Sequence, residues 1–409
     1  MSTSSPRKYE IYGQSFKQRA YEVYASMRSN DPVFCQPGLD GETLIWFVSR
    51  YDEVVAALKD DHRFARDPRL ALPSGQVNNP LGSLADLINN HMLNRDGEEH
   101  RRLRNLVSQA FTPRQVAELR PRIQTIADDL LDRVADRGQM DLIDDYAFPL
   151  PITVIAELLG IPVADRNKFR IWSDAFVTPD LSPGATERFG ALALEFVGYL
   201  RELFEARRVA PQDDLISGLL QAEEAGDQLS EGELFSTVVL LIIAGHETTV
   251  GLIGNSSLAL LQHPDELARL KAEPELMATA VEELLRYDPP VERALNRWTT
   301  EEVELGGRRI PAGQPVILIL GAANRDEQQF DDPDDLDIER RPNPHVAFGR
   351  GAHYCLGAPL ARLEGEIALN TLWRRLPNLR LAIDPGELQW RSSPTMRGVT
   401  ALPVVWDVP

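Results

Sequence analysis

The feature that most limits how this chain can fold is a long apolar segment at residues 234–261. Ser230 and Glu233 precede it at the three-residue spacing of a helix capping box. The segment is therefore predicted to form one helix of roughly seven turns, long enough to cross much of the molecule. Its longest uninterrupted apolar run, residues 238–245, is far shorter than the roughly 20 residues that cross a bilayer, so no membrane span is expected.

Helical patterning also dominates the rest of the chain. Helices are predicted at residues 51–59, 98–138, 152–159 and 185–208, with Thr112 and Pro113 marking one helix start. Strands are predicted at residues 43–48, as a hairpin and strand within 303–320, and through 388–405. Residues 71–95 are predicted to form a long loop, and the prolines of residues 177–184 indicate a hinge. The fold class expected is mainly α (α+β), in a single domain over residues 1–409.

Composition places this chain among soluble globular proteins, with 43% hydrophobic and 26% charged residues. A formal net charge of -19 argues against nucleic acid as a partner, because phosphates require a basic surface. The two cysteines, Cys35 and Cys355, stand in dissimilar contexts far apart. A disulfide framework is therefore not expected, and a reducing cytoplasm fits best. The amino terminus lacks the layout of a secretory signal.

Inside the long apolar segment, the sequence AGHETT at residues 244–249 places a glycine, a carboxylate and two hydroxyls in the middle of a helix. Glycine costs up to about 1 kcal/mol there relative to alanine, and threonine can bond back to the preceding turn. One interpretation is that Glu247 faces solvent. The other is that the helix passes a reactive centre, to which Glu247 and Thr248 relay protons.

A second unusual stretch surrounds Cys355, which lies among glycines and just before an apolar helical pattern. Glycines permit a positive φ and a close approach of the backbone. Amide N–H groups and the following helix start would favour the thiolate, the form that binds iron. Three alternatives stay open: a zinc site with His353, a cysteine nucleophile, and a buried inert cysteine.

The residues around Cys355 resemble the haem-binding signature of the cytochrome P450 superfamily. The matching positions are Phe348, Gly349, Gly351, His353, Cys355 and Gly357. The resemblance extends over nearly the whole chain and includes AGHETT, the E-x-x-R pair Glu283 and Arg286, and the HRRLR stretch at residues 100–104. It implies a helix-rich triangular prism with a small β-rich region, and haem b as cofactor.

The resemblance also implies roles for individual residues. Cys355 would be the proximal thiolate ligand of the iron. Glu283 and Arg286 would be a structural pair, bonded to the RRPNP segment around Arg340 and supporting the thiolate loop. The haem propionates would be held by His100, Arg104, Arg297 and His353. Further haem contacts are implied for Ala244, Phe348, Gly349 and Gly357.

The activity implied is that of a monooxygenase, in which Glu247 and Thr248 match the acid and alcohol that deliver protons. Electrons would come from a separate ferredoxin or flavodoxin with an NAD(P)H-dependent reductase, and Arg101, Arg102 and Arg350 are candidate docking charges. A peroxygenase of the same fold would lack the acid and alcohol pair. A non-catalytic haem sensor is the alternative from a different class.

The expected substrate is a medium-to-large hydrophobic molecule, because the positions that line the family's pocket are mainly apolar here. They are the loop at residues 81–92, Phe176, Leu240, Ile243, Ala244, Ala294, Leu295, and the segment 396–399 that begins with Met396. The sequence as a whole most resembles actinobacterial hydroxylases of macrolides and other polyketides. A fatty acid, steroid or terpene is the alternative, and Arg293 and Arg397 are candidates to pair with a substrate carboxylate.

Overall fold

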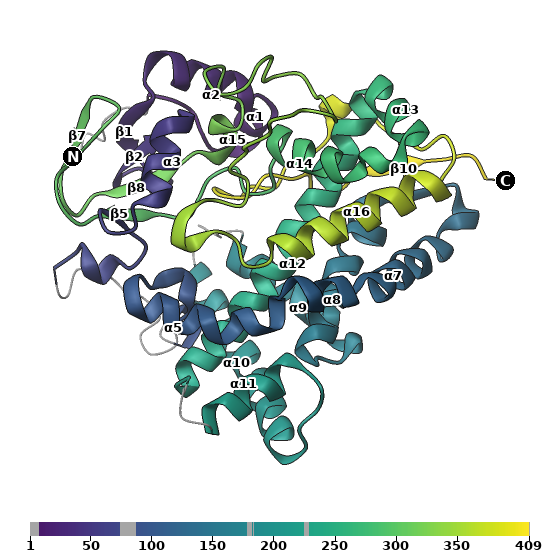
Figure 1. The fold of residues 1–409 in the computed structure, drawn as a ribbon, viewed down its shortest axis with the longest axis horizontal. Helices are drawn as coiled ribbons and strands as arrows, with labels where there is room; N and C mark the ends of the chain where they lie inside the picture. Colours follow the sequence, from purple (N-terminus) through teal and green to yellow (C-terminus); the bar gives the residue numbers. More distant parts are fainter. Residues whose placement is uncertain (1–7, 74–86, 178–181, 183, 225–228, 409) are drawn as a thin grey trace.

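The structure, a computed structural model of the chain, describes residues 8–73, 87–177, 182, 184–224 and 229–408. The molecule has a roughly triangular outline, with helices filling most of it and the larger sheet at the corner near the N-terminus (Figure 1). The expected helix-rich fold with a small β-rich region is confirmed.

The described α-helices follow the predicted pattern with some changes. They are α1 Gly13–Gln18, α2 Ala20–Asn30, α3 Tyr51–Lys59, α5 Gly97–Ser108, α6 Pro113–Glu118, α7 Arg120–Asp132, α8 Pro149–Leu159, α9 Arg166–Val177, α10 Ala185–Val209, α11 Leu215–Glu224, α12 Glu231–Gln262, α13 Pro264–Ala272, α14 Met277–Tyr287, α15 Leu320–Ala323 and α16 Ala358–Arg375. The predicted helical region 98–138 is divided into α5, α6 and α7, because Thr112 and Gln115 form a capping box that starts a new helix at Pro113.

Two of the predicted irregular segments fall partly outside the described residues. In the predicted loop at residues 71–95, residues 74–86 are not described, while residues 87–89 are helical and Met92–Asn94 form a 3₁₀ turn. The predicted hinge lies between α9 and α10, and residues 178–181 and 183 within it are not described. α10 begins directly after Gly184, which has a φ of 77°.

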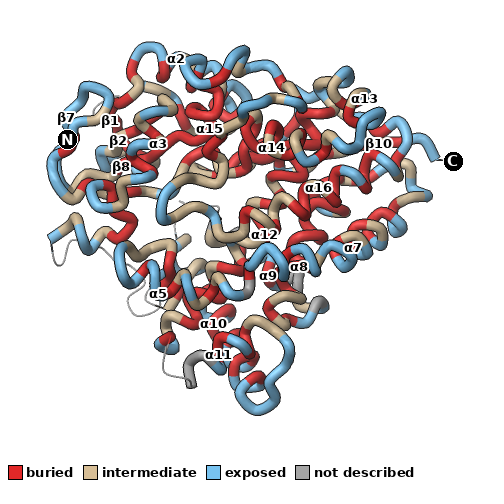
Figure 2. Tube along the Cα trace, in the orientation of Figure 1, coloured by how far each residue is buried: buried red, intermediate tan, exposed pale blue. Residues whose placement is uncertain are grey.

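The predicted long helix is α12, and it runs through the middle of the molecule (Figure 1). Ser230 Oγ accepts a hydrogen bond from the Glu233 N–H at 3.3 Å, and Glu233 Oε2 accepts one from the Ser230 N–H at 2.8 Å, so the capping box is confirmed. α8, α14 and α16 pack against α12 and share the largest apolar core. Figure 2 shows these helices mostly buried.

α12 is also the helix, among the described residues, that is long and apolar enough to cross a membrane. In the fold, 67% of its most apolar window is buried inside the protein. Its apolar character is therefore accounted for by packing against neighbouring helices.

The strands form three sheets. A five-stranded sheet has the order β1 Val33–Pro37, β2 Leu44–Val48, β8 Pro315–Leu318, β5 Arg297–Thr299 and β3 Phe64–Ala65. A three-stranded sheet has the order β4 Gln139–Asp141, β10 Pro403–Val405 and β9 Arg380–Leu381, and β6 Val303–Leu305 pairs with β7 Arg308–Ile310. The pairs β1–β2 and β6–β7 are antiparallel, and β2–β8 is parallel. The predicted strand, and the hairpin followed by a strand, are therefore confirmed.

The prediction of a strand-rich segment through residues 388–405 is wrong for most of its length. The segment contains β10 and two isolated bridges, Val291 with Met396 and Trp390 with Val399. Its backbone N–H groups bond in single pairs to residues at 290, 389 and 398, so no continuous ladder forms. The segment is instead a buried loop that lies against α12.

Candidate functional site

The loop that carries Cys355 is a tight structure built on glycines. Gly349 has a φ of 69° and Gly351 a φ of 74°, values that L side chains rarely adopt. The Gly349 N–H donates to the Val346 carbonyl at 2.8 Å, and the Cys355 N–H donates to the Phe348 carbonyl at 3.0 Å. The loop therefore fixes the cysteine at the start of α16.

The Cys355 side chain is accessible to solvent, although protein atoms surround it on most sides. Burial raises the pKa of its thiol, and the backbone N–H groups of Gly357 and Ala358 and the charge of Arg104 oppose this without reversing it. The donors expected from the sequence are therefore present, but they do not by themselves favour the thiolate. A bound metal cation would, because a coordinating thiol is deprotonated.

α12 carries an accessible apolar face. Most of the middle of α12 is buried, yet Ala244 is exposed, and Leu240, Ile243 and Thr248 are half-buried. Their spacing of three to four residues places them on one face of the helix. This face suits a flat apolar ligand.

Basic side chains from three parts of the chain gather near the Cys355 loop. The rings of His100 on α5 and His353 in the loop lie 4.3 Å apart. The Arg104 guanidinium donates to the Tyr354 carbonyl at 2.7 Å, and that of Arg297 donates to the Phe64 carbonyl at 2.8 Å. Burial lowers the pKa of His100 to about 4. The four residues predicted from the resemblance to bind propionates are thus associated with one region of the fold.

Two members of this region were missed by sequence reasoning. Asp96, directly before α5, accepts hydrogen bonds from the N–H groups of Arg66 at 2.7 Å and Asp67 at 2.8 Å, and its Oδ1 lies 2.9 Å from His353 Nε2. The buried Arg66 side chain donates to the Leu93 carbonyl at 3.1 Å. No local spacing points to Arg66, whereas a carboxylate four residues before His100 could have been noticed.

The geometry also bears on the alternatives for Cys355. His353 is directed to Asp96 and His100, so it is engaged away from the role of a base for a nucleophilic thiol. Among the described residues, no three His, Cys, Asp or Glu side chains group as a metal site, so the zinc alternative gains no support.

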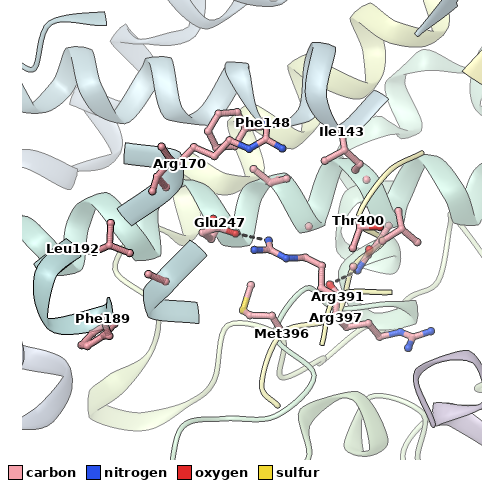
Figure 3. A pocket seen from close by; sticks show the side chains of 18 of the residues that line it. Ile143, Phe148, Arg170, Phe189, Leu192, Glu247, Arg391, Met396, Arg397 and Thr400 are labelled. Carbon is pink, nitrogen blue, oxygen red and sulfur yellow. Dashed lines mark hydrogen bonds and ion pairs between the residues drawn. The ribbon is translucent and has the colours of Figure 1, made fainter. Parts of the chain in front are cut away.

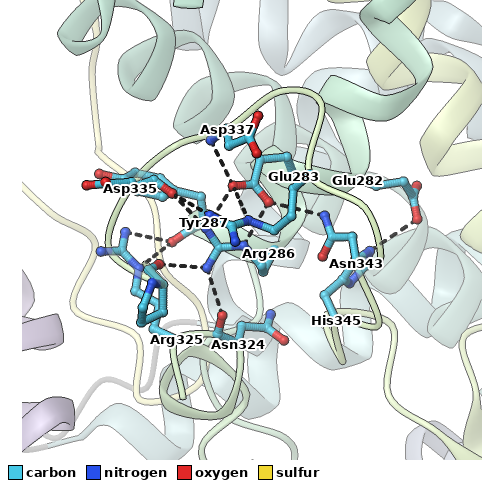
Figure 4. Close-up of polar contacts among 12 residues, drawn as sticks. Glu282, Glu283, Arg286, Tyr287, Asn324, Arg325, Asp335, Asp337, Asn343 and His345 are labelled. Atoms are coloured by element: carbon cyan, nitrogen blue, oxygen red, sulfur yellow. Dashed lines mark hydrogen bonds and ion pairs between the residues drawn. The ribbon is translucent and has the colours of Figure 1, made fainter. Parts of the chain in front are cut away.

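Glu283 and Arg286 on α14 are fully buried and form the centre of a polar network (Figure 4). Arg286 Nε and Nη2 donate to the Glu283 carboxylate at 2.7 and 2.8 Å. The same carboxylate accepts from the Asp337 N–H at 3.0 Å and from the side chains of Arg340 and Asn343, each at 3.1 Å. The network joins α14 to the segment that leads into the Cys355 loop.

Comparison with known proteins places this arrangement in a family. Residues 183–404 match the family model described as Cytochrome P450. The polyketide biosynthesis cytochrome P450 PksS of Bacillus subtilis (strain 168) is 44% identical over 399 residues, covering 97% of this chain and 98% of that protein. The chain belongs to the cytochrome P450 family.

Two further relatives support this. Cytochrome P450 107B1 of Saccharopolyspora erythraea is 46% identical to this P450 over 416 residues, covering 99% of each protein. The crystal structure of the myxobacterial cytochrome P450 CYP267B1 in complex with myristic acid matches with a TM-score of 0.94 at 47% identity, covering 98% of this chain and 100% of that one.

Cytochromes P450 bind haem, iron protoporphyrin IX, through a cysteine thiolate. The residues of this P450 fit that group. Cys355 is accessible at the end of a glycine loop, and α12 offers an apolar face. Arg66, Arg104 and Arg297 supply three guanidinium groups in this region, where Asp96, Asp61 and Asp60 are the carboxylates that act on Arg297, and buried cations of this kind suit two propionates.

Glu247 and Thr248 are not joined to each other in the P450 structure. Thr248 Oγ1 donates to the Ala244 carbonyl at 2.9 Å, whereas Glu247 Oε2 accepts from Arg391 Nη1 at 2.5 Å (Figure 3). Glu247 Oε1 lies 3.4 Å from His246 Nε2. Burial raises the pKa of Glu247, but His246 and Arg391 more than offset this and hold it at about 2.

Glu247 and Arg391 line a cavity of about 960 Å³ that is built from α9, α10, α12 and the C-terminal loop (Figure 3). Of the predicted substrate positions, residues 396–399 line it, including Met396 and Arg397. Phe176 packs on Phe189 between α9 and α10, with ring centroids 5.0 Å apart. Leu240 and Ile243 lie on the accessible face of α12, Ala294 is half-buried, Leu295 is 43% exposed, and residues 81–86 are not described.

Arg293 and Arg397 are engaged with the protein rather than with solvent or propionates. Arg293 Nη2 donates to the Ile11 carbonyl at 2.6 Å. Arg397 donates to Asp288 and to the Lys17 carbonyl, both at 2.6 Å. Both guanidinium groups are buried and anchor the N-terminal helices. We therefore do not assign either of them to a substrate carboxylate.

The three candidate docking arginines differ in availability. Arg102 forms an ion pair with Glu233, and Arg350 donates to the Pro344 and His345 carbonyls at 2.9 and 3.1 Å. The Arg101 side chain is 71% exposed and lies 3.9 Å from Glu98. Arg101 is the one of the three whose charge is presented mainly to solvent.

Proposed function

We propose that this P450 monooxygenase hydroxylates or epoxidises a medium-to-large hydrophobic molecule of the polyketide or fatty acid type. It would use O2 and two electrons from a separate ferredoxin or flavodoxin with an NAD(P)H-dependent reductase. The observation that carries the proposal is the accessible Cys355 in its glycine loop, next to Arg104, in a fold whose central helix α12 has an accessible apolar face.

Bound haem would supply the activation of O2. Cys355 would hold the iron, Arg104 and Arg297 would neutralise the propionates, and His100 and His353 would hydrogen-bond to them. Ala244, Phe348, Gly349 and Gly357 would border the ring. Thr248 Oγ1 would hold a proton on the substrate side of α12. Glu247 would resupply this proton from the cavity on its own side, after its carboxylate leaves Arg391.

The substrate class is supported by the apolar side chains on the accessible face of α12 and by two relatives. One relative is named for polyketide biosynthesis, and another was crystallised with myristic acid. Because Arg293 and Arg397 are already paired, a substrate carboxylate would need another partner. Contacts with the hydrocarbon part of the molecule would then provide most of the affinity.

The direct experiment is to purify the haem-loaded protein, reduce it under carbon monoxide and record its spectrum. A thiolate-type band is expected, and an imidazole-type spectrum would overturn the assignment of Cys355. Turnover with a surrogate ferredoxin and reductase would then be measured on macrolactones, fatty acids, steroids and terpenes. Oxygenated macrolactone or fatty acid is expected. A thiolate spectrum without any product would instead indicate a haem sensor.

The proton role is tested with Thr248→Ala. Loss of the hydroxyl is expected to lower the ratio of product to NAD(P)H consumed several-fold, with hydrogen peroxide released in place of product. Thr249→Ala is the control, because Thr249 is buried on a neighbouring face of the same helix. An unchanged ratio in Thr248→Ala, or an equal loss in both variants, would contradict the role.

A further inference from the structure

A second ion pair on α14 lies next to the buried Glu283 and Arg286 and is distinct from them. Glu282 accepts from Arg362 Nε at 2.6 Å and from Arg362 Nη2 at 2.8 Å, a bidentate arrangement between α14 and α16. Both side chains are about one-third exposed, at 29% and 31%. Neither residue belongs to the acid and alcohol pair or to the basic cluster described above.

This pair reaches the Cys355 loop through several contacts. Glu282 Oε2 lies 3.1 Å from His345 Nε2, at the beginning of the loop (Figure 4). Arg362 Nη1 donates to the Tyr354 hydroxyl at 3.2 Å, and its guanidinium carbon lies 4.5 Å from the centre of the Phe348 ring. The loop is thus held at its beginning, its middle and its end.

The contacts converge on the backbone of Cys355. Tyr354 precedes the cysteine directly, and the Phe348 carbonyl accepts the Cys355 N–H at 3.0 Å. Arg362 touches both of these residues, and its charge also lowers the pKa of the Cys355 thiol. A shift of Arg362 would therefore change both the position and the electrostatic surroundings of the sulfur.

The charges of the pair are well defined. The His345 ring accepts the Ala347 N–H at Nδ1, at 3.2 Å, so its proton is on Nε2 and is donated to Glu282. Burial raises the pKa of Glu282, but Arg362 and His345 more than offset this and hold it at about 2. Glu282 and Arg362 therefore place one anion and one cation beside the loop. The cation, Arg362, is the one that contacts Tyr354 next to Cys355.

We infer that Glu282 and Arg362 are positioning residues that set the reduction potential of the iron held by Cys355, through the orientation of the loop and the opposed charges of the pair. The inference rests on the proposed haem–thiolate function. A cation near the iron favours its reduced, more negative state, and an anion disfavours that state. Removing each charge should therefore shift the potential in opposite directions.

The test measures the reduction potential of the haem-loaded protein by spectroelectrochemical titration. Arg362→Gln is expected to give a negative shift and Glu282→Gln a positive shift. The double variant should fall between the two, near the wild type. If the pair were merely structural, both single variants would shift the potential in the same direction or leave it unchanged, and either result would overturn the inference.

The control is Glu157→Gln. Glu157 forms a bidentate pair with Arg122 at 2.8 and 2.5 Å, and its exposure of 31% is close to that of Glu282, while Arg122 is 51% exposed; this pair joins α8 to α7. The reduction potential of the Glu157→Gln variant should match that of the wild type, and a shift as large as those of the test variants would overturn the inference.

The carbon monoxide spectrum of the wild type separates this inference from the proposed function. If that spectrum lacks the thiolate band, the proposed function itself has failed.

Discussion

At the scale of single residues, the Cys355 loop depends on glycine for two different reasons. Gly349 and Gly351 both have a positive φ, which costs an L residue about 1–2 kcal/mol. A Cβ on Gly349 would have the His353 carbonyl oxygen 3.9 Å away, in ordinary contact. A Cβ on Gly351 would lie 2.6 Å from the Leu58 carbonyl oxygen, so the loop could not approach α3 as it does.

This difference predicts unequal effects of two matched substitutions. Gly351→Ala should reduce haem content and lower the thermal midpoint more than Gly349→Ala, because it adds a clash with the α3 backbone to the same φ strain. Haem absorbance per protein and thermal unfolding would measure both variants. Equal losses would show that the φ strain alone decides.

At the scale of elements, α12 separates two environments. Thr248 lies on the accessible apolar face, whereas Glu247 borders the 960 Å³ cavity and is tied to Arg391 of the C-terminal loop. The pKa of Glu247 is low, about 2, because of His246 first and Arg391 second, so these contacts together stabilise the fold above the unfolded pKa of about 4.3. The contribution is lost as the pH falls from about 4.3 towards 2.

Arg391→Gln is therefore expected to lower the free energy of unfolding by about 1–2 kcal/mol at pH 6. The difference from the wild type should shrink as the pH falls below about 4.3, because Glu247 becomes protonated in the unfolded state first. Urea unfolding at several pH values would measure it. Arg170→Gln is the control, since Arg170 lines the same cavity but pairs with Asp144 at the surface. A deficit that is independent of pH would contradict the assignment.

At the scale of the whole molecule, buried charges join the two ends of the chain. Lys17 on α1 donates to the Met396 carbonyl at 2.7 Å and pairs with the buried Glu292. The Arg397 guanidinium in turn donates a hydrogen bond to the backbone carbonyl of Lys17. The chain carries a net charge of -19, yet several of its cations are buried in this network and beside the Cys355 loop. The positions of these cations, more than their number, connect distant parts of the fold.

The sequence by itself determined the features that depend on local spacing. The capping box of α12, the glycine loop of Cys355 and the i,i+3 pair of Glu283 and Arg286 involve residues close together in the chain. Local conformation therefore decides these geometries. The helix-rich fold could be predicted for a related reason, because helical periodicity is carried by residues only three and four positions apart.

Only the tertiary structure decided which distant charges meet. Arg391 pairs with Glu247 across 144 residues, and Asp96 meets His353 across 257. Arg293 and Arg397 turn to the N-terminal helices. A buried guanidinium needs acceptors for its five N–H groups, and the packing of several elements supplies those acceptors. The spacing of residues along the sequence therefore does not predict which acceptors a buried arginine will meet.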